Sequence, residues 1–141
     1  MSPSALRNGW NTRLAPDAEA IAELAEQAVN ALPPPFREPA RAVSIQVEDW
    51  PSQELLDTLG MSDAMDLTGL YEGVPLTERS ISDPPQLPDV IRLFRLPILW
   101  EWIERGNVEL GDLVSHIVVH ELAHHFGWSD DDIAAIDRWW E

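Results

Sequence analysis

Apolar residues first recur with a helical period between residues 17 and 32. One face of a helix there would carry five apolar side chains, Ile21, Leu24, Ala25, Ala28 and Leu32. Acidic residues occupy the first turn, where they complement the helix dipole, and three prolines from Pro33 onward end the pattern. We therefore expect a helix over residues 17–32. Residues 1–16 have no such period and contain several turn-forming residues, so we expect a flexible tail there.

The middle of the chain is typical of β-structure. Three segments are candidate strands, residues 42–47, 70–74 and 89–96. The first alternates apolar and polar side chains, as a half-buried strand does. Arg92 and Arg95 interrupt the apolar run of the third, which favours an edge of the sheet over its centre. The proline-rich stretch 77–88 between the second and the third predicts a loop.

Helical patterns make up most of the remaining chain. Four further segments are predicted helices, residues 54–59, 98–105, 112–126 and 130–140. Gly60 and Gly106 follow the first two of these as stop signals. Helices and strands in this order predict the α+β class, with a small mixed sheet packed against helices in a single domain over residues 17–141.

Composition narrows the possible functions. The 141 residues include nine Arg, no Lys, no Cys and 25 acidic residues, so the formal net charge is −16. Without Cys there are no disulfides, thiolate ligands or Cys nucleophiles, and without Lys there is neither a Schiff-base lysine nor a phosphate-loop lysine. So acidic a chain is repelled by phosphate backbones and anionic lipid, and we expect no nucleic-acid or membrane partner. No secretory signal and no membrane-spanning stretch are visible, so a cytoplasmic protein is expected.

The candidate chemistry is concentrated in residues 120–130, whose sequence is HELAHHFGWSD. His120 and His124 are four residues apart, so both imidazoles lie on one face of a helix, as two nitrogen ligands of one zinc ion require. Glu121 lies about 100° round the helix from His120 and can reach a metal-bound water without ligating the metal. The alternative is a pair of hydrogen-bonded histidines at the end of a buried helix.

A third protein ligand is expected just beyond the histidines. Gly127 allows the helix to end in a left-handed turn, so that Asp130 can return toward the metal and leave the fourth position to water. Residues 129–132, Ser-Asp-Asp-Asp, are also an ordinary helix start with Ser129 as cap. Asp131 or Asp132 is therefore the alternative third ligand.

This segment resembles the zincin metallopeptidases, in particular a small bacterial family with a minimal zincin fold. Members of that family carry His-Glu-x-x-His-His-Phe-Gly followed by an Asp. Residues 70–76, Arg79 and residues 87–94 are similar to the middle section of that family. The resemblance covers about residues 17–140.

The resemblance implies a zinc-dependent peptidase with one zinc ion. His120, His124 and Asp130 would be its metal ligands and Glu121 its general base. In zincins a strand near the motif helix presents its edge to the bound peptide, and here that strand would be the one around residues 91–96. Only 11 residues follow Asp130, so we expect neither a downstream subdomain nor a Met-turn to wall the pocket.

Two other functions use the same residues. One is a metal-stabilised binding module without turnover, which the missing pocket wall favours, and the other is hydrolysis of a non-peptide amide. Residues 101–141 carry two Arg and ten acidic residues, 2 − 10 = −8, which favours a neutral or basic peptide as substrate.

The remaining conspicuous side chains have structural interpretations. His125 points away from His124 and is expected to pack or to form a hydrogen bond. His116 lies one turn before His120, as a support of the site or a purely structural residue. Tyr71 is expected in a buried turn, with donation to an oxyanion as the alternative. The tryptophans expected in the core or in oligomer contacts are Trp100, Trp102, Trp139 and Trp140.

Overall fold

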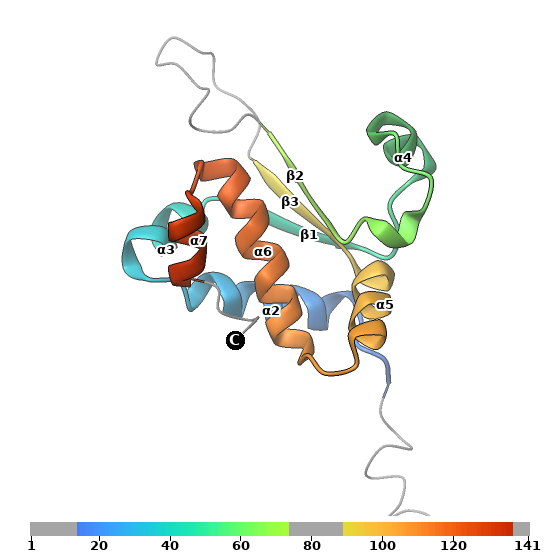
Figure 1. The fold of residues 1–141 in the computed structure, drawn as a ribbon, viewed down its shortest axis with the longest axis horizontal. Coiled ribbons are helices and arrows are strands. Elements are labelled where there is room, and N and C mark those ends of the chain that lie inside the picture. The colour runs from blue at the N-terminus through green and yellow to red at the C-terminus, as the bar shows by residue number, and fades with distance from the viewer. Residues whose placement is uncertain (1–13, 74–88, 137–141) are drawn as a thin grey trace, which may run out of the picture.

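The computed structural model describes residues 14–73 and 89–136 (Figure 1). The helices in these ranges are α2 (Ala18–Asn30), α3 (Pro34–Ala40), α4 (Gln53–Leu59), α5 (Arg95–Arg105), α6 (Leu110–Phe126) and α7 (Asp130–Ile136), with a short 3-10 helix, η2 (Ala64–Asp66). The strands are β1 (Ser44–Glu48), β2 (Gly69–Glu72) and β3 (Val90–Phe94). The predicted α+β class is confirmed. The proline-rich loop, most of the predicted tail and the end of the last predicted helix lie outside the described residues.

Local signals determine where the helices begin and end. Asp17 precedes α2, and its side chain accepts a hydrogen bond from the Ala20 N–H at 2.8 Å. Gly60, Gly106 and Gly127 follow α4, α5 and α6 with φ values of 70°, 71° and 66°. This left-handed conformation is cheap only for glycine, so the three predicted stop signals are confirmed.

Helix α3 was not predicted from the sequence pattern. Proline has no N–H to donate, and its φ is fixed near the helical value, so it is tolerated in the first turn of a helix. Pro34 and Pro35 therefore begin α3, although the same proline run ends α2.

The three strands form one sheet in the order β1-β3-β2, with β3 parallel to β1 and antiparallel to β2. The prediction that the strand around residues 91–96 lies at an edge is therefore wrong, because β3 is the central strand. Arg92 is tolerated there because it projects from the half-exposed face of the sheet. Its guanidinium lies 3.9 Å from Glu48 of β1 and 3.5 Å from Glu72 of β2.

Arg95 was assigned to the strand but begins helix α5, three residues before the predicted helix start. Its guanidinium donates to Asp49 at 2.7 Å and to the carbonyl of Pro16 at 3.1 Å, which ties α5 to the segment before α2. Trp102 of α5 is half-buried and donates to the Val108 carbonyl at 2.8 Å. Of the other tryptophans expected in the core or in oligomer contacts, Trp100 is 45% exposed, and Trp139 and Trp140 lie outside the described residues.

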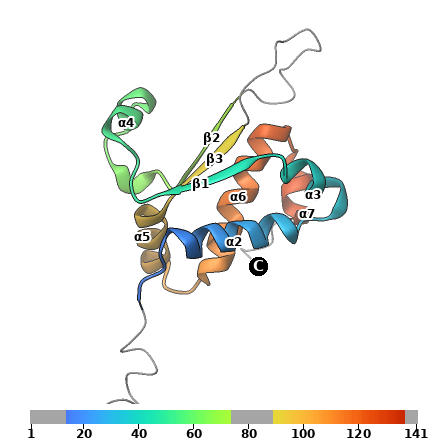
Figure 2. The same cartoon turned by 180° about the vertical axis from the view of Figure 1, so that it is seen from behind.

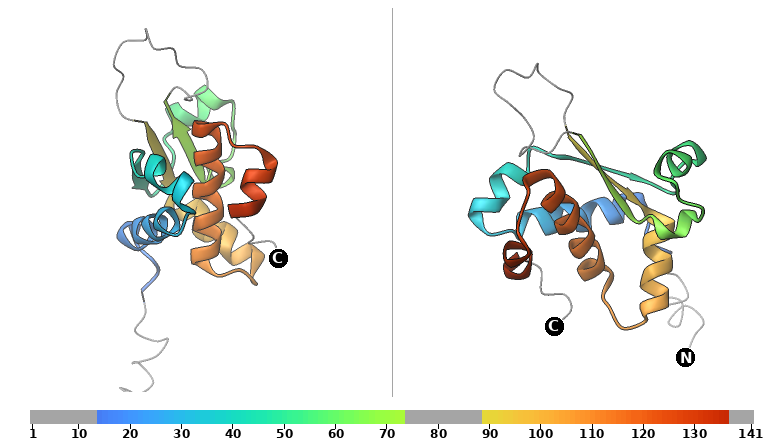
Figure 3. Two further views of the ribbon diagram at one scale, coloured as in Figure 1. Left: turned by 90° about the vertical axis from the view of Figure 1, so that its left-hand side faces the viewer. Right: turned by 45° about the horizontal axis from the view of Figure 1, so that its top comes forward.

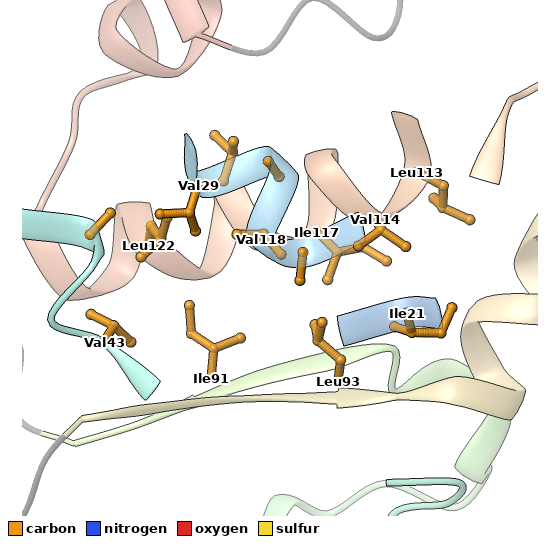
Figure 4. Packing of buried hydrophobic residues seen from close by; sticks show 14 of the residues in the cluster. Ile21, Val29, Val43, Ile91, Leu93, Leu113, Val114, Ile117, Val118 and Leu122 are labelled. Carbon is orange, nitrogen blue, oxygen red and sulfur yellow. The ribbon is translucent and has the colours of Figure 1, made fainter. Parts of the chain in front are cut away.

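Helices α2 and α6 lie together on one face of the sheet and enclose the main core with it (Figures 1 and 2). Figure 4 shows Ile91 and Leu93 of the central strand pointing toward Val118 and its neighbours on α6. All three side chains are fully buried, and each such burial is worth about 1.5–3 kcal/mol. The core thereby holds α6 across the sheet.

Helix α7 turns back beside the C-terminal end of α6 after Gly127 (Figure 3). None of the helices in residues 14–73 and 89–136 is long and apolar enough to cross a bilayer.

Candidate metal centre

Helix α6 carries both core residues and exposed histidines. Val118 and Leu122 are buried against the core, whereas His120 and His124 are exposed. Because four residues make about one helical turn, the two imidazoles lie on the same exposed face of α6. The predicted helix over the motif is therefore present, and it presents both histidines to solvent, where a metal ion can reach them.

Glu121 follows His120 and lies half-buried beside strand β2. The backbone N–H of Tyr71 and the imidazole of His124 both lie close enough to its carboxylate to favour the negative charge. Burial is the largest influence and raises the pKa of Glu121, and these two contacts offset the rise only in part. A carboxyl group whose pKa is raised toward neutrality is suited to accepting and releasing a proton.

A pocket of about 220 Å³ lies beside Glu121. Its walls come from the start of β2, from α5 and from α6, and consist of Thr68, Gly69, Glu101, Arg105, His116, Ile117, His120 and Glu121. A larger hollow of about 470 Å³ lies between α2, α3 and β1, but no histidine lines it. We therefore identify the site by its chemistry and not by its size.

Several pocket residues were not recognised in the sequence. Glu101 and Arg105 form an ion pair at 3.0 Å along α5, in the ordinary i,i+4 spacing of a helix surface. Thr68 stands in an irregular segment before β2. Nothing local marks these residues, because only the packing of α5 and β2 beside α6 brings them to the pocket.

His116 belongs to the same wall. Its ring centroid lies 4.3 Å from that of His120, with the two rings tilted by 59°. His116 was expected to be either a support of the site or a purely structural residue, and this contact with His120 is compatible with both roles.

Asp130 is exposed at the first position of α7. In residues 14–73 and 89–136, no three His, Asp or Glu side chains lie close enough together to hold a metal ion. The structure therefore brings His120 and His124 to one face but does not gather Asp130 with them into a three-ligand cluster.

The turn before α7 is a capping box formed by two other residues. The Asp132 N–H donates to the Ser129 hydroxyl at 3.1 Å, and the Ser129 N–H donates to the Asp132 carboxylate at 3.0 Å. Ser129 is thus the cap, as expected. Because Asp132 has this structural role, Asp130 and Asp131 are the candidate carboxylate ligands of this turn.

His125 and Tyr71 lie on the inner side of the site. His125 is only 3% exposed, and its Nδ1 lies 3.1 Å from the Tyr71 hydroxyl, in agreement with the expected hydrogen-bonding role. Tyr71 lies in β2 and not in a turn. Its hydroxyl donates to Asp89 at 3.2 Å, and Tyr71 is not among the residues that line the pocket. The alternative role as an oxyanion donor therefore has no support in this arrangement.

The donor set at the end of α6 fits zinc in its chemistry. Imidazole nitrogens are preferred zinc ligands, and the two exposed rings have the one-turn spacing that two ligands on a helix need. A carboxyl group adjacent to this pair, but on a different side of the helix, is available as a proton acceptor. The fit is complete for the histidine pair, whereas the third ligand stays a prediction.

A His-Glu-x-x-His helix laid across a small mixed sheet, with a carboxyl group beside an exposed histidine pair, is the arrangement expected of a zincin-type metallohydrolase. The family model of zincin-like metallopeptidases matches residues 40–140, and the chain belongs to this family. Membership implies zinc binding and a peptidase-type function. Helix α2 precedes the matched region, although it supplies part of the main core. No curated protein matches this chain.

Proposed function

We propose that this protein is a zinc-dependent peptidase in which His120 and His124 bind the metal and Glu121 is the general base. Asp130 is proposed as the third ligand. The observation that carries the proposal is the half-buried Glu121 carboxylate, held by a backbone N–H of β2 beside two exposed imidazoles. Membership of the zincin-like family supports it.

The chemical steps are divided between metal and protein. A bound zinc ion would lower the pKa of a water molecule and polarise the scissile carbonyl. Glu121 supplies the proton acceptor and then donates the proton to the leaving amine. The Tyr71 N–H orients the carboxylate, and burial raises the pKa of Glu121, so that the same group can both take and release the proton.

We propose β2, an outer strand of the three-stranded sheet, as the strand with which a bound peptide pairs. The Phe94 N–H donates to the Thr68 carbonyl, so alternate residues of β2 direct their backbone groups to β3, and Gly69 and Tyr71 direct theirs away from it. Gly69 also lines the pocket, where an extended peptide can pair with its backbone. This assignment replaces the strand around residues 91–96, which is central. The acidic balance of residues 101–141 favours neutral or basic peptides.

The direct test is the substitution Glu121→Gln, which keeps the shape of the side chain and an oxygen acceptor for the Tyr71 N–H but removes the base. We expect unchanged zinc content by plasma emission and a fall in kcat/KM of at least about 100-fold on a peptide cleaved by the wild-type protein. Glu23→Gln, an exposed change on α2, is the matched control. Equal turnover by wild-type protein and Glu121→Gln would exclude Glu121 as the base.

A second candidate is a zinc-stabilised binding module without turnover. The absence of a three-ligand cluster in the described parts of the chain favours it. Cleavage of a peptide library by the zinc-loaded protein separates the two functions. Stabilisation by zinc without any cleavage would select the binding module, and cleavage that Glu121→Gln abolishes would select the peptidase.

A further inference from the structure

Three polar side chains from three elements meet beneath the candidate site. They are Tyr71 of β2, Asp89 immediately before β3, and His125 of α6. The Tyr71 hydroxyl donates to Asp89 at 3.2 Å, and the Nδ1 of His125 lies 3.1 Å from that hydroxyl and 3.4 Å from the Asp89 carboxylate. Asp89 and His125 are buried, at 8% and 3% exposure. We call these three residues the β2 anchor.

The hydrogen-bond directions within the β2 anchor are mutually consistent. The single proton of the Tyr71 hydroxyl is given to Asp89, so the hydroxyl oxygen can only accept from His125. His125 therefore carries a proton on Nδ1, which points toward two oxygen acceptors. A buried polar group costs free energy unless it has such partners, so the contacts resist separation of β2 from α6.

Glycine at position 73 leaves room for the anchor. A Cβ atom there would overlap the Asp89 carboxylate and would lie 2.7 Å from the Tyr71 hydroxyl. Gly73 also has a φ of 145°, which side chains other than glycine rarely adopt. The chain thus leaves β2 in a way that lets Tyr71 and Asp89 approach each other.

Tyr71 also lies beside Glu121. Its hydroxyl belongs to the β2 anchor, while its backbone N–H lies close enough to the Glu121 carboxylate to favour the negative charge. The end of β2 and the beginning of β3 lie beside the C-terminal end of α6 in each view (Figures 1 and 3). A shift of β2 relative to α6 would therefore move the N–H away from Glu121.

We propose that Tyr71, Asp89 and His125 are positioning residues. Through the Tyr71 N–H they hold the Glu121 carboxylate in place, and they also fix the outer strand β2 against α6. The catalytic part of this proposal rests on the proposed function, because it takes Glu121 as the base. The structural part, that the anchor holds the contact between Tyr71 N–H and Glu121, does not depend on peptidase activity.

Tyr71→Phe removes the hydroxyl and keeps the ring. Amide hydrogen exchange of the full chain, before and after chelation of metal, measures the result at single residues. We expect exchange at amide 71, which faces Glu121, to accelerate at least about tenfold more than exchange at amide 70, which faces β3. Trp102→Phe is the matched control, because it also removes one half-buried hydrogen bond but lies on α5.

A purely structural role predicts a different pattern. Loss of global stability accelerates exchange at amides 70 and 71 equally, and that outcome would overturn the proposal. Asp89→Asn keeps an oxygen acceptor for the Tyr71 hydroxyl, so it should lose less of the protection at amide 71 than Tyr71→Phe does.

Turnover gives the second readout on the zinc-loaded protein. If Glu121 is the base, Tyr71→Phe should lower kcat at least about tenfold and change KM less. The substitution disturbs the alignment of the base with the bound peptide, whereas it leaves the affinity for the peptide nearly unchanged. An unchanged kcat in an active protein would overturn the positioning role. If the protein has no peptidase activity, the proposed function fails, and the exchange at amide 71 alone decides whether the anchor holds Glu121.

Discussion

The four histidines of α6 lie in different surroundings, although they lie within ten residues of one another. His120 and His124 are exposed on one face, His116 contacts the ring of His120, and His125 is buried against Tyr71. The helical period accounts for the difference, since a step of four residues keeps a side chain on its face and a step of one turns it by about 100°. Residue spacing thus separates the two proposed metal ligands, His120 and His124, from the buried His125.

Glu121 should destabilise the metal-free protein. Burial raises the pKa of Glu121 in the folded state, so the folded protein binds its proton more tightly than the unfolded chain does. The stability associated with this group is therefore fully present below the usual glutamate range, near pH 4, and is lost as the pH rises through the raised pKa. Glutamine does not ionise, so Glu121→Gln avoids this loss of stability. In the presence of a chelator, the variant should therefore melt a few degrees above the wild-type protein at pH 7.

Thermal melts in a chelator between about pH 4 and pH 7.5 measure this difference. The difference in melting temperature between Glu121→Gln and the wild-type protein should be small at the acidic end of this range and should grow toward neutral pH. Glu23→Gln, at an exposed position of α2, should melt at the same temperature as the wild-type protein across this range. A variant that melts below wild-type protein at pH 7 would contradict the burial cost.

At the scale of elements, the approach of β2 to α6 determines the pocket. A Cβ atom on Gly69 would lie only 2.7 Å from Cγ2 of Ile117, so this close packing depends on a glycine at the start of β2. The same residue lines the pocket beside Glu121. The close packing of β2 on α6 and the placement of Glu121, the proposed base, are therefore linked.

Gly69→Ala should cost about 1–3 kcal/mol of unfolding free energy, because the new methyl group overpacks the contact with Ile117. In an Ile117→Ala background the same substitution should cost much less, since Cγ2 is absent there. Gly111→Ala is the matched control on α6. Its new Cβ would lie 3.5 Å from Leu24, an ordinary contact, and alanine should stabilise the helix by up to about 1 kcal/mol. Chemical denaturation of the wild-type protein, the three single variants and the double variant measures these free energies, and equal costs of Gly69→Ala in both backgrounds would contradict the overpacking.

The order of the elements explains the one error about the sheet. Arg92 made β3 resemble an edge strand, yet acidic residues on both neighbouring strands accept its charge at the half-exposed face of the sheet. Its other face carries Ile91 and Leu93, which are fully buried. A charged residue in a strand therefore indicates that one face of the sheet is polar. When helices cover only one side of a sheet, its central strands have such a face as well as its edge strands, so the charge does not identify an edge.

At the scale of the whole molecule, zinc binding should stabilise the fold by mass action. Free zinc at 1,000 times its Kd would add about 4 kcal/mol to the unfolding free energy and raise the melting temperature, and chelation should reverse the rise. Asp130→Asn should reduce the zinc-dependent rise, whereas Asp131→Asn should leave it unchanged if Asp130 is the third ligand. Magnesium, which prefers oxygen ligands, is the control cation. A rise that is lost in Asp131→Asn and kept in Asp130→Asn would identify Asp131 instead.

The sequence by itself determined the features that depend on a few neighbouring residues. The period of residues 112–126 predicted α6, Gly127 predicted its end, and the spacing of His120 and His124 predicted their common face. These features follow from backbone geometry, which acts over one or two turns. The tight start of α3 at a proline run was missed, because the same residues can end one helix and begin the next.

Only the tertiary structure decided which elements meet at the site. It made β3 central, brought Glu101 and Arg105 to the pocket, and paired Tyr71 with both Glu121 and His125. These residues are separated by up to 54 positions in the chain, so no local pattern could relate them. The physical reason is that strand order and helix packing are selected by the apolar area buried in the common core, which depends on the whole chain at once.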